Sequence, residues 1–544
     1  MIRKFFFVCL FVCLVASGLA QAVNTHEAIN GWHLLDPVRD GYMGISLDKA
    51  YGLLKDRKAT TVIVAVIDSG IDTAQEDLRP VLWRNPKEIS GNGIDDDHNG
   101  YVDDIYGWNF CGSPDGQNQV RNSFEIPRVY HGWKNQFEGK KEKDIPADQR
   151  FLYSQWKKAA DQIEGDYESA SRQWLGLANF YKNMENTSHT ICEYLSATSF
   201  TWKEVKPLMK NDRRNVAAAA EFWNDLFSRN GDESALNTAF LAELADYRSQ
   251  LDAKIARKTQ PPQDWRTERV KDNYTDINDR YYGNNNLKEG SGDHGTLVAG
   301  TIAAVRNNGI GMDGIANQVQ IMAVRAVPGG DEHDKDIALA IRYAVDNGAS
   351  IINMSFGKPV SPYKQFVDDA VKYAASKGVL LIHASGNEGE NISQQTFYPM
   401  PLFLDGTRAT NYLTVGASGD LSTGGYAAPF SNYSHDYVDL FAPGMNIYST
   451  ASGNQYKSAD GTSLACPVVT GVAALLKSYF PELTPEQLIR VLTNSGAPLN
   501  ETVTQPGSDK KVNFQTLSSS GRIVNAFAAV QMALSLSSAP AKAF

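Results

Sequence analysis

Three segments that lie far apart in the chain each carry a side chain suited to nucleophilic catalysis. Asp68 ends a buried apolar run, His294 lies in a glycine-flanked segment before a helix of small residues, and Ser463 precedes an apolar helix. A serine hydroxyl becomes a nucleophile when a base takes its proton and a carboxylate orients that base. Taken singly, each residue also has a structural reading, as a turn residue, a surface histidine or a helix N-cap. Their occurrence together, each at an element junction, favours catalysis.

A fourth candidate is Asn387, which follows an apolar run and is flanked by Gly386 and Gly389. An asparagine amide in such a place can donate a hydrogen bond to the oxyanion that forms when a nucleophile attacks a carbonyl group. The backbone N–H of Ser463 would be the second donor. By itself Asn387 would be read as a turn residue.

The elements that would hold these side chains alternate between apolar runs and helical patterns. The run from 61 to 67 is β-branched without polar alternation, which is typical of a strand buried on both faces. Similar strands are expected at 319–324, 351–354, 379–382, 412–415 and 438–441, with helices at 335–345, 363–376 and 468–476. The alternation predicts an α/β fold with a doubly wound, mostly parallel sheet flanked by helices. In such sheets the chemistry lies at the carboxyl ends of the strands.

With its motifs in the order Asp, His, Ser, the sequence resembles the subtilisin-like serine proteases, the subtilase family. The resemblance extends over residues 40–112 and 273–535. It implies that Asp68 orients His294, that His294 acts as general base and then as general acid, and that Ser463 attacks the peptide carbonyl.

The same resemblance implies two further parts of the site. Asn387 matches the asparagine of the family's oxyanion hole. Ser355, Phe356 and Gly357 match its substrate-binding strand, which would pair with an extended peptide by β-augmentation. The expected function is therefore that of a secreted serine endopeptidase acting on peptides or proteins. A catalytically inactive, peptide-binding relative is the alternative.

Two positions depart from the family pattern. Leu297 occupies a place where many relatives have a second histidine, and Leu464 occupies a place where methionine usually follows the serine. Neither position takes part in proton transfer, so we expect activity to be retained. The packing around His294 and Ser463 should differ from that of the relatives.

Residues 113–272 read as a helical insertion between two parts of the catalytic domain, 23–112 and 273–535. Helical patterns are expected at about 147–163, 167–184, 215–227 and 235–256. Long helices with several aromatic residues can bury one apolar stripe among themselves, which predicts an antiparallel helical subdomain. We further hypothesise that it forms a lid that limits access to Ser463. Residues 536–544 are expected to form a flexible tail.

The first 22 residues have the features of a secretory signal peptide. Arg3 and Lys4 precede an apolar run, and Ala20 and Ala22 give the small-residue pattern of a cleavage site. The mature protein is therefore expected in the periplasm or outside the cell. Three cysteines remain after the signal, and we expect them to be free, although a Cys111–Cys192 pairing stays open.

The segment from 92 to 104 resembles a calcium-binding loop. Oxygen ligands occur at alternate positions, namely Asp95, Asp97, Asn99, the carbonyl of Tyr101, and Asp103. Position 12 of the loop is Tyr106 instead of the bidentate glutamate. Structural Ca²⁺ is one reading and a solvated acidic turn is the other, while the catalytic chemistry itself requires no cofactor.

Composition and residue order exclude several other functions. The formal net charge is −10 and lysines and arginines are not clustered, so no nucleic-acid partner is expected. After the signal, no apolar stretch is long enough to span a membrane. An esterase of the α/β-hydrolase type needs a histidine after its nucleophile, and none follows Ser463. A metallohydrolase motif of the His-Glu-x-x-His type is also absent, and the oligomeric state is left open.

Overall fold

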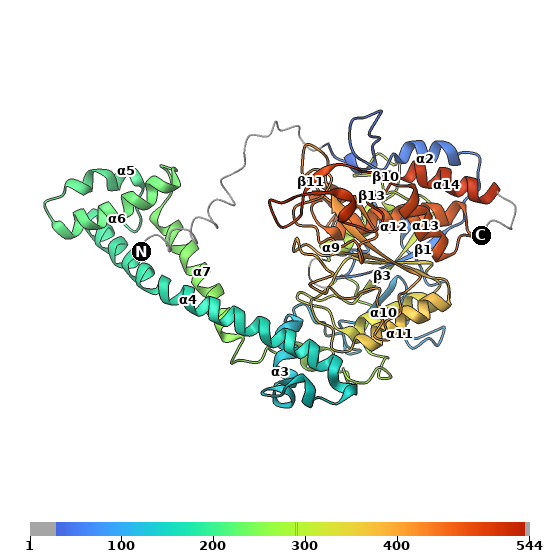
Figure 1. The fold of residues 1–544 in the computed structure, drawn as a ribbon, viewed down its shortest axis with the longest axis horizontal. Coiled ribbons are helices and arrows are strands. Elements are labelled where there is room, and N and C mark those ends of the chain that lie inside the picture. Colours follow the sequence, from blue (N-terminus) through green and yellow to red (C-terminus); the bar gives the residue numbers. More distant parts are fainter. Residues whose placement is uncertain (1–28, 289, 291, 539–544) are drawn as a thin grey trace. The chain divides into compact units, whose positions relative to one another are not determined.

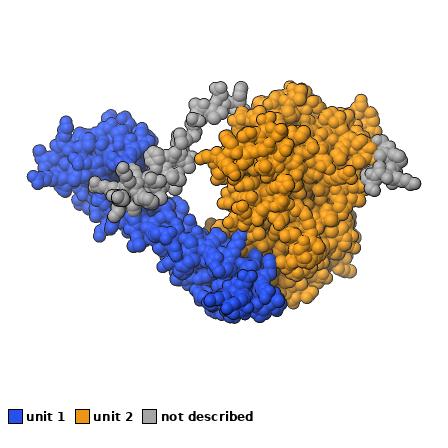
Figure 2. Space-filling model, viewed as in Figure 1, with its two compact units in different colours: residues 1–21, 126–262 blue, residues 22–125, 263–544 orange. Residues whose placement is uncertain are grey.

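The computed structural model of the chain describes residues 29–288, 290 and 292–538 (Figure 1). The chain divides into two compact units (Figure 2). The sheet unit comprises the described residues before 126 and after 262, and the helical unit comprises residues 126–262. The segments 113–125 and 263–272 of the expected insertion belong to the sheet unit. The expected signal peptide, residues 1–22, lies outside the described residues.

A nine-stranded sheet forms the centre of the sheet unit, in the order β10-β13-β7-β6-β5-β4-β1-β3-β2. Each pair of neighbouring strands is parallel except β10 and β13, which confirms the predicted mostly parallel sheet. The strands are β1 (Val62–Asp68), β2 (Gly107–Asn109), β3 (Val319–Arg325), β4 (Ile351–Met354), β5 (Leu380–Ala384), β6 (Tyr412–Ser418), β7 (Leu440–Pro443), β10 (Ala497–Pro498) and β13 (Arg522–Ile523).

Helices cover both faces of this sheet (Figure 1). One face carries α2 (Leu47–Leu54), α9 (Asp293–Ala303), α12 (Thr462–Tyr479), α13 (Pro485–Ser495) and α14 (Ala526–Ser538). The other face carries α10 (Asp334–Asp346) and α11 (Lys364–Ser376). An apolar core lies on each face of the sheet, and alternate residues of β1 belong to different cores. Val64 and Val66 pack on the α12 side, while Ala65 and Ile67 pack on the α10 side. The sheet is therefore doubly wound.

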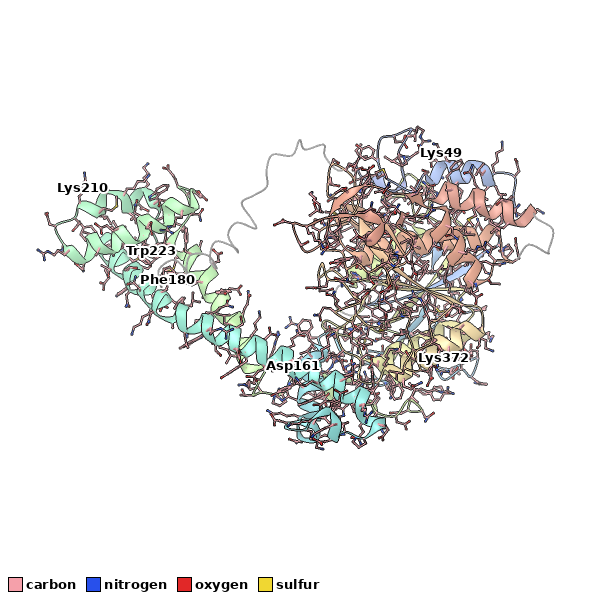
Figure 3. All side chains as sticks on the ribbon, in the orientation of Figure 1. Lys49, Asp161, Phe180, Lys210, Trp223 and Lys372 are labelled. Carbon is pink, nitrogen blue, oxygen red and sulfur yellow. The ribbon has the colours of Figure 1, made fainter. Side chains whose placement is uncertain are left out.

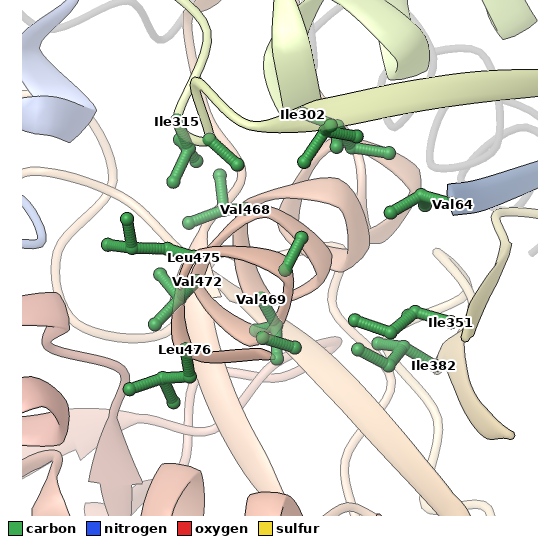
Figure 4. Packing of buried hydrophobic residues seen from close by; sticks show 14 of the residues in the cluster. Val64, Ile302, Ile315, Ile351, Ile382, Val468, Val469, Val472, Leu475 and Leu476 are labelled. Carbon is green, nitrogen blue, oxygen red and sulfur yellow. The ribbon is translucent and has the colours of Figure 1, made fainter. Parts of the chain in front are cut away.

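Helix α12 is the central helix of its layer. Its valines and leucines pack against apolar side chains of β1, β4, β5 and α9 (Figure 4). Contrary to the expectation that no stretch after the signal is long and apolar enough to span a membrane, α12 would suffice by length and hydropathy, but it is almost wholly buried in this core. Two small antiparallel hairpins complete the unit, β8 (Ile447–Ala451) with β9 (Gln455–Ala459) and β11 (Thr502–Thr504) with β12 (Lys511–Asn513). A short helix, α8 (Trp265–Arg269), lies where the chain returns to the sheet unit.

The helical unit is built mainly from α3 (Glu125–Phe137), α4 (Arg150–Leu195), α5 (Trp202–Val205), α6 (Arg214–Asn230) and α7 (Asn237–Ala256). It has its own apolar core, centred on the fully buried Trp223, with Phe180 beside it (Figure 3). Gln173 and Glu164 of α4 bond to Tyr247 and Lys258 respectively, so α4 and the α7 region run in opposite directions. The predicted antiparallel packing of helices is therefore present.

The expectation of separate helices at 147–163 and 167–184 was wrong. The structure has one helix, α4, of 46 residues. The interval between the two patterns contains Gly165, which lowers helix propensity by about 1 kcal/mol relative to alanine but does not end a helix.

At the other end of the chain, α14 continues to Ser538, and the remaining residues of the expected tail lie outside the described part.

Candidate active site

Asp68 and His294 meet at the carboxyl end of β1. The Nδ1 atom of His294 donates a hydrogen bond of 2.7 Å to Oδ1 of Asp68, and the backbone N–H of Ser69 donates to the same oxygen. A carboxylate oxygen can only accept, so Nδ1 carries the hydrogen. In the neutral ring Nε2 is then free to accept a proton. The Asp68 side chain is buried, whereas that of His294 is 40% exposed.

Gly295 allows α9 to approach β1 this closely. A Cβ atom on Gly295 would lie 2.2 Å from the carbonyl oxygen of Gly70 and 3.2 Å from the Cβ of Asp68. Gly70 itself has a φ of +112°, a conformation that side chains rarely permit. Gly70 and Gly295, which follow Asp68 and His294 in the chain, therefore set the distance between strand and helix.

The Asp68 carboxylate controls the protonation of His294. Desolvation of the imidazole lowers the pKa of His294, but the negative charge of Asp68 and its hydrogen bond outweigh this, so the pKa lies above the usual 6.5. Imidazolium is therefore stabilised in this position. That is the property required of a base that must hold a proton during a reaction.

Ser463 lies in the first turn of α12, directly after Gly461 and Thr462. Its backbone carbonyl accepts a 2.9 Å hydrogen bond from the hydroxyl of Ser355, at the end of β4. The positive end of the helix dipole is at this terminus, where it favours developing negative charge. Within the described residues no hydrogen bond joins the Ser463 hydroxyl to His294. In structures without substrate, such catalytic contacts are often longer than in the reacting complex.

Asn387 is held by Thr462, a residue whose role no sequence motif indicates. Its Oδ1 accepts hydrogen bonds from the backbone N–H of Thr462 at 2.8 Å and from the Thr462 hydroxyl at 3.0 Å. The amide is therefore oriented with Nδ2 left for another acceptor. A Cβ on Gly461 would lie 2.8 Å from Ser463 Oγ and 3.7 Å from Asn387 Nδ2. The two atoms thus border the same space, which the absence of a side chain at Gly461 leaves open.

Asn432, whose role was also not predicted from the sequence, supports the loop that carries Asn387. Its side chain accepts from the N–H groups of Glu388 and Glu390 and donates to the carbonyl of Ser385 at 3.0 Å. Asn432 is buried and lies more than forty residues further along the chain. Nothing in the local sequence links it to Asn387, so only the folded structure reveals this support.

The segment Ser355–Gly357 directly follows β4, beside the end of β5. The Ser355 hydroxyl is occupied, since it accepts from Asn353 and donates to Ser463. The carbonyl of Phe356 accepts a 2.7 Å hydrogen bond from Nε2 of His383. This backbone is thus fixed in place, and its pairing with a substrate peptide stays a prediction.

His383 is a buried histidine without access to solvent. Desolvation lowers its pKa to about 4, so the ring is neutral at ordinary pH, and Nε2 carries the hydrogen donated to Phe356. These surroundings indicate a structural role for His383. It holds the segment after β4 in register with β5.

In the acidic loop, oxygen atoms of Glu88, Asp95 and Asp97 lie within 4.8 Å of one another. Glu88 precedes the predicted calcium motif and was missed because the motif counts only residues of one loop. Both oxygens of Asp103 instead accept from backbone N–H groups, those of Gly91 and Gly93.

The other two predicted ligands of that loop also make contacts within the fold. Asn99 accepts from the N–H of Tyr101 at 2.8 Å. The ring of Tyr101 packs edge-on against Trp108 in the core.

Cys111, Cys192 and Cys466 are all free, as expected, and Cys192 is the one that is only partly buried.

Comparison with known proteins identifies the family. Residues 59–518 match the sequence model of the Subtilase family. The chain belongs to the subtilase family. A thermophilic serine proteinase of Bacillus sp. (strain AK1) is 42% identical to this subtilase over 186 residues, which cover 34% of this chain and 42% of the relative.

Two further relatives of this subtilase carry descriptive names. Alkaline elastase YaB of Bacillus sp. (strain YaB) is 38% identical over 227 residues, covering 42% of this chain and 55% of the relative. Subtilisin Savinase of Lederbergia lenta is 38% identical over 221 residues, covering 40% of this chain and 76% of the relative. This subtilase spans about half the length of the serine proteinase and the elastase.

Proposed function

We propose that this subtilase is an exported serine endopeptidase. The observation that carries the proposal is the hydrogen bond between Asp68 and His294, at the end of β1, in a fold whose helix α12 presents Ser463 at its N-terminus. Membership of the family supports the same chemistry. Export is supported by the signal-like sequence of residues 1–22.

In the first step, Nε2 of His294 takes the proton of Ser463 as Oγ adds to the carbonyl carbon of the substrate. The imidazolium that forms is stabilised by the buried Asp68 carboxylate. His294 then gives its proton to the leaving nitrogen, and the peptide C–N bond breaks. Water attacks the acyl-enzyme by the same route, with His294 again as base, and Ser463 is regenerated.

The negative charge on the substrate oxygen develops beside Gly461. Asn387 Nδ2 and the backbone N–H of Ser463 are the donors available there, and Thr462 keeps the amide of Asn387 in the orientation that offers Nδ2. These donors are in place before substrate arrives, so little reorganisation is needed during the reaction. The substrate chain N-terminal to the scissile bond is proposed to pair with Ser355–Gly357 as an added strand.

The test compares wild type with Ser463→Ala on a peptide library and with a serine-directed phosphonate reagent. Wild type should cleave peptides and take up one equivalent of reagent, and Ser463→Ala should do neither. Ser478→Ala is a matched control, because it removes a buried hydroxyl from the same helix, near its other end. It should cleave like wild type.

Cleavage by Ser463→Ala, free of contaminating protease, would exclude the proposal. Binding of peptides by a wild type that neither cleaves nor reacts with the phosphonate would support the alternative, an inactive peptide-binding subtilase.

We also propose that Glu88, Asp95 and Asp97 hold a structural Ca²⁺. Calcium prefers carboxylate and carbonyl oxygens, and these three residues supply them close together. One oxygen of Glu88 accepts from the N–H of Asp96, while the other, Oε2, is buried with no hydrogen-bond partner in the described part of the chain. A cation would supply the missing partner. The ion would stabilise the loop and would take no part in the peptide chemistry.

Melting temperatures with calcium and with a chelator test this second proposal. Calcium should raise the melting temperature of wild type because it binds the folded state. Glu88→Gln should abolish the difference. Asp161→Asn, an exposed acid of the helical unit, should leave it intact. Equal melting temperatures of wild type in both conditions would contradict a stabilising site.

A further inference from the structure

A small apolar cluster lies beside the two helices that carry the proposed base and nucleophile. Its buried members are Trp32, Leu297, Ile447 and Leu464, with Tyr42 and Ala459 packed against them. It is separate from the two large cores on either side of the sheet. We call it the Trp32 cluster.

Two members of the Trp32 cluster are direct neighbours of catalytic candidates. Leu297 lies three residues after His294 on α9, so both face the same side of the helix. Leu464 directly follows Ser463 on α12. These are the two positions at which the sequence departs from the family pattern. The cluster therefore joins one helix to the other within one turn of each reacting side chain.

Trp32 fills this cluster from the N-terminal segment of the chain. Its side chain is 1% exposed, and its indole N–H donates a 3.0 Å hydrogen bond to the carbonyl of Met445, just before β8. An indole is the largest side chain available, and its N–H fixes the ring in one orientation. No other member of the cluster has such a directional bond in the described part of the chain.

The segment that carries Trp32 is itself anchored. The N–H groups of Ile45 and Ser46 bond to the carbonyls of His33 and Leu35, which closes the segment into a loop. Ala526 of α14 then donates its N–H to the carbonyl of Ile45 at 2.8 Å. The loop also packs tightly on itself, because a Cβ on Gly44 would lie 2.6 Å from the carbonyl oxygen of Trp32. The position of the indole is thus determined by the body of the sheet unit.

The separation of His294 from Ser463 depends on how α9 and α12 are packed. Protein interiors are close-packed, so the volume of a side chain between two helices sets their spacing. A displacement of about 1 Å between reacting groups can cost about 100-fold in rate. This matters here because no hydrogen bond in the described structure holds the Ser463 hydroxyl to His294.

We propose that Trp32 is a positioning residue for catalysis, which sets the distance between His294 and Ser463 through Leu297 and Leu464. The inference rests on the proposed serine endopeptidase activity. If the inference holds, catalysis requires residues 31–46, the segment that precedes the first strand of the sheet. Substrate does not touch Trp32, so its replacement should change the chemical step and leave substrate binding unchanged.

The experiment compares Trp32→Leu and Trp32→Phe with a matched control, Trp83→Leu. Trp83 is equally buried but belongs to the core on the other face of the sheet. For each full-length variant, kcat and KM for one peptide substrate are measured well below its melting temperature, after titration of active sites. Trp32→Leu should lower kcat at least tenfold with KM within twofold of wild type. Trp32→Phe, which retains an aromatic ring, should recover most of kcat.

The control separates positioning from general destabilisation. Trp83→Leu should lower the melting temperature about as much as Trp32→Leu does and leave kcat within twofold of wild type. A wild-type kcat in folded Trp32→Leu, or an equal loss of kcat in Trp83→Leu, would overturn the inference. If Trp32→Leu does not fold, the same comparison is made with Trp32→Met and Trp83→Met, with the same expected results. A wild type without Ser463-dependent hydrolysis would instead refute the proposed function.

Discussion

Replacement of Asp68 by asparagine tests how the carboxylate acts on His294. Both the ring Nδ1 of His294 and the N–H of Ser69 donate to Oδ1 of Asp68. The amide oxygen of asparagine can take the place of Oδ1 and accept both bonds, which would leave the tautomer and orientation of His294 unchanged. The substitution then removes the negative charge and puts an NH2 group at the buried position of Oδ2, which has no hydrogen-bond partner among the described residues.

The free energy lost with this charge can be calculated from the attraction between the carboxylate and the imidazolium. Two unit charges 4 Å apart attract by about 4 kcal/mol at an effective dielectric constant of 20. Because 40% of the His294 side chain is exposed, solvent screening reduces this to about 2–3 kcal/mol. This energy is gained when imidazolium forms in the transition state. At about 1.4 kcal/mol per factor of ten, kcat should fall about 30- to 150-fold in Asp68→Asn.

The pH profile of kcat/KM tests whether Asp68 raises or lowers the pKa of His294. In wild type the acid limb should lie above pH 6.5, because Asp68 raises the pKa of His294 and the base is lost when the imidazole is protonated. In Asp68→Asn desolvation remains without the opposing charge, so the pKa should fall and the acid limb should move to lower pH. Asp72→Asn, a buried acid four residues further on that is paired with Lys288, is the control and should move neither quantity. An acid limb that stays in place in Asp68→Asn would refute the electrostatic reasoning.

Three further substitutions have defined outcomes. Asn387→Ala should lower kcat about 10²–10³-fold with little change in KM, the range known for removing one oxyanion donor from a subtilisin; a loss below threefold would contradict its role. Gly295→Ala places a methyl group 2.2 Å from the carbonyl oxygen of Gly70, so it should lower both melting temperature and kcat, and wild-type values would show that α9 is not held there. Burial lowers the pKa of His383 to about 4, so the unfolded state binds a proton that the folded state does not, and about 3 kcal/mol of stability should be lost as pH falls from 6.5 to 4. Unfolding of His383→Gln by denaturant should show a smaller loss over this range, and an unchanged loss would assign it to other groups.

The sheet could be predicted because its long central strands can be recognised in the sequence as apolar segments. A strand buried on both faces must be mostly apolar, so β1 appears as a β-branched run and β3 and β4 as mainly apolar segments even in a single sequence. The pairing of Asp68 with His294 was implied by the resemblance to the subtilases, and the two side chains are hydrogen-bonded in the structure.

The residues that were missed support the site from a distance. Thr462 orients Asn387, Asn432 braces its loop, and Trp32 packs against the neighbours of His294 and Ser463. Each acts through a contact between segments far apart in sequence, and no local pattern encodes such contacts. The single long helix α4 was missed for a different reason, because periodicity locates apolar faces but does not show whether a helix continues through a glycine. That the helical insertion limits access to Ser463 stays a prediction.

The position of β1 has a consequence for how the chain folds. β1 lies between β3 and β4, and its Val62 pairs with Val319, so neither neighbour is synthesised until some 250 residues later. Contacts of such long range make folding slow, because the entropy of closing a long loop precedes any gain from pairing. The helical unit shortens this loop, since Nε2 of His131 near its start bonds to the carbonyl of Arg257 near its end at 2.8 Å. Once the helical unit has formed, the residues between His131 and Arg257 no longer lengthen the loop that must close to bring β1 and β3 together.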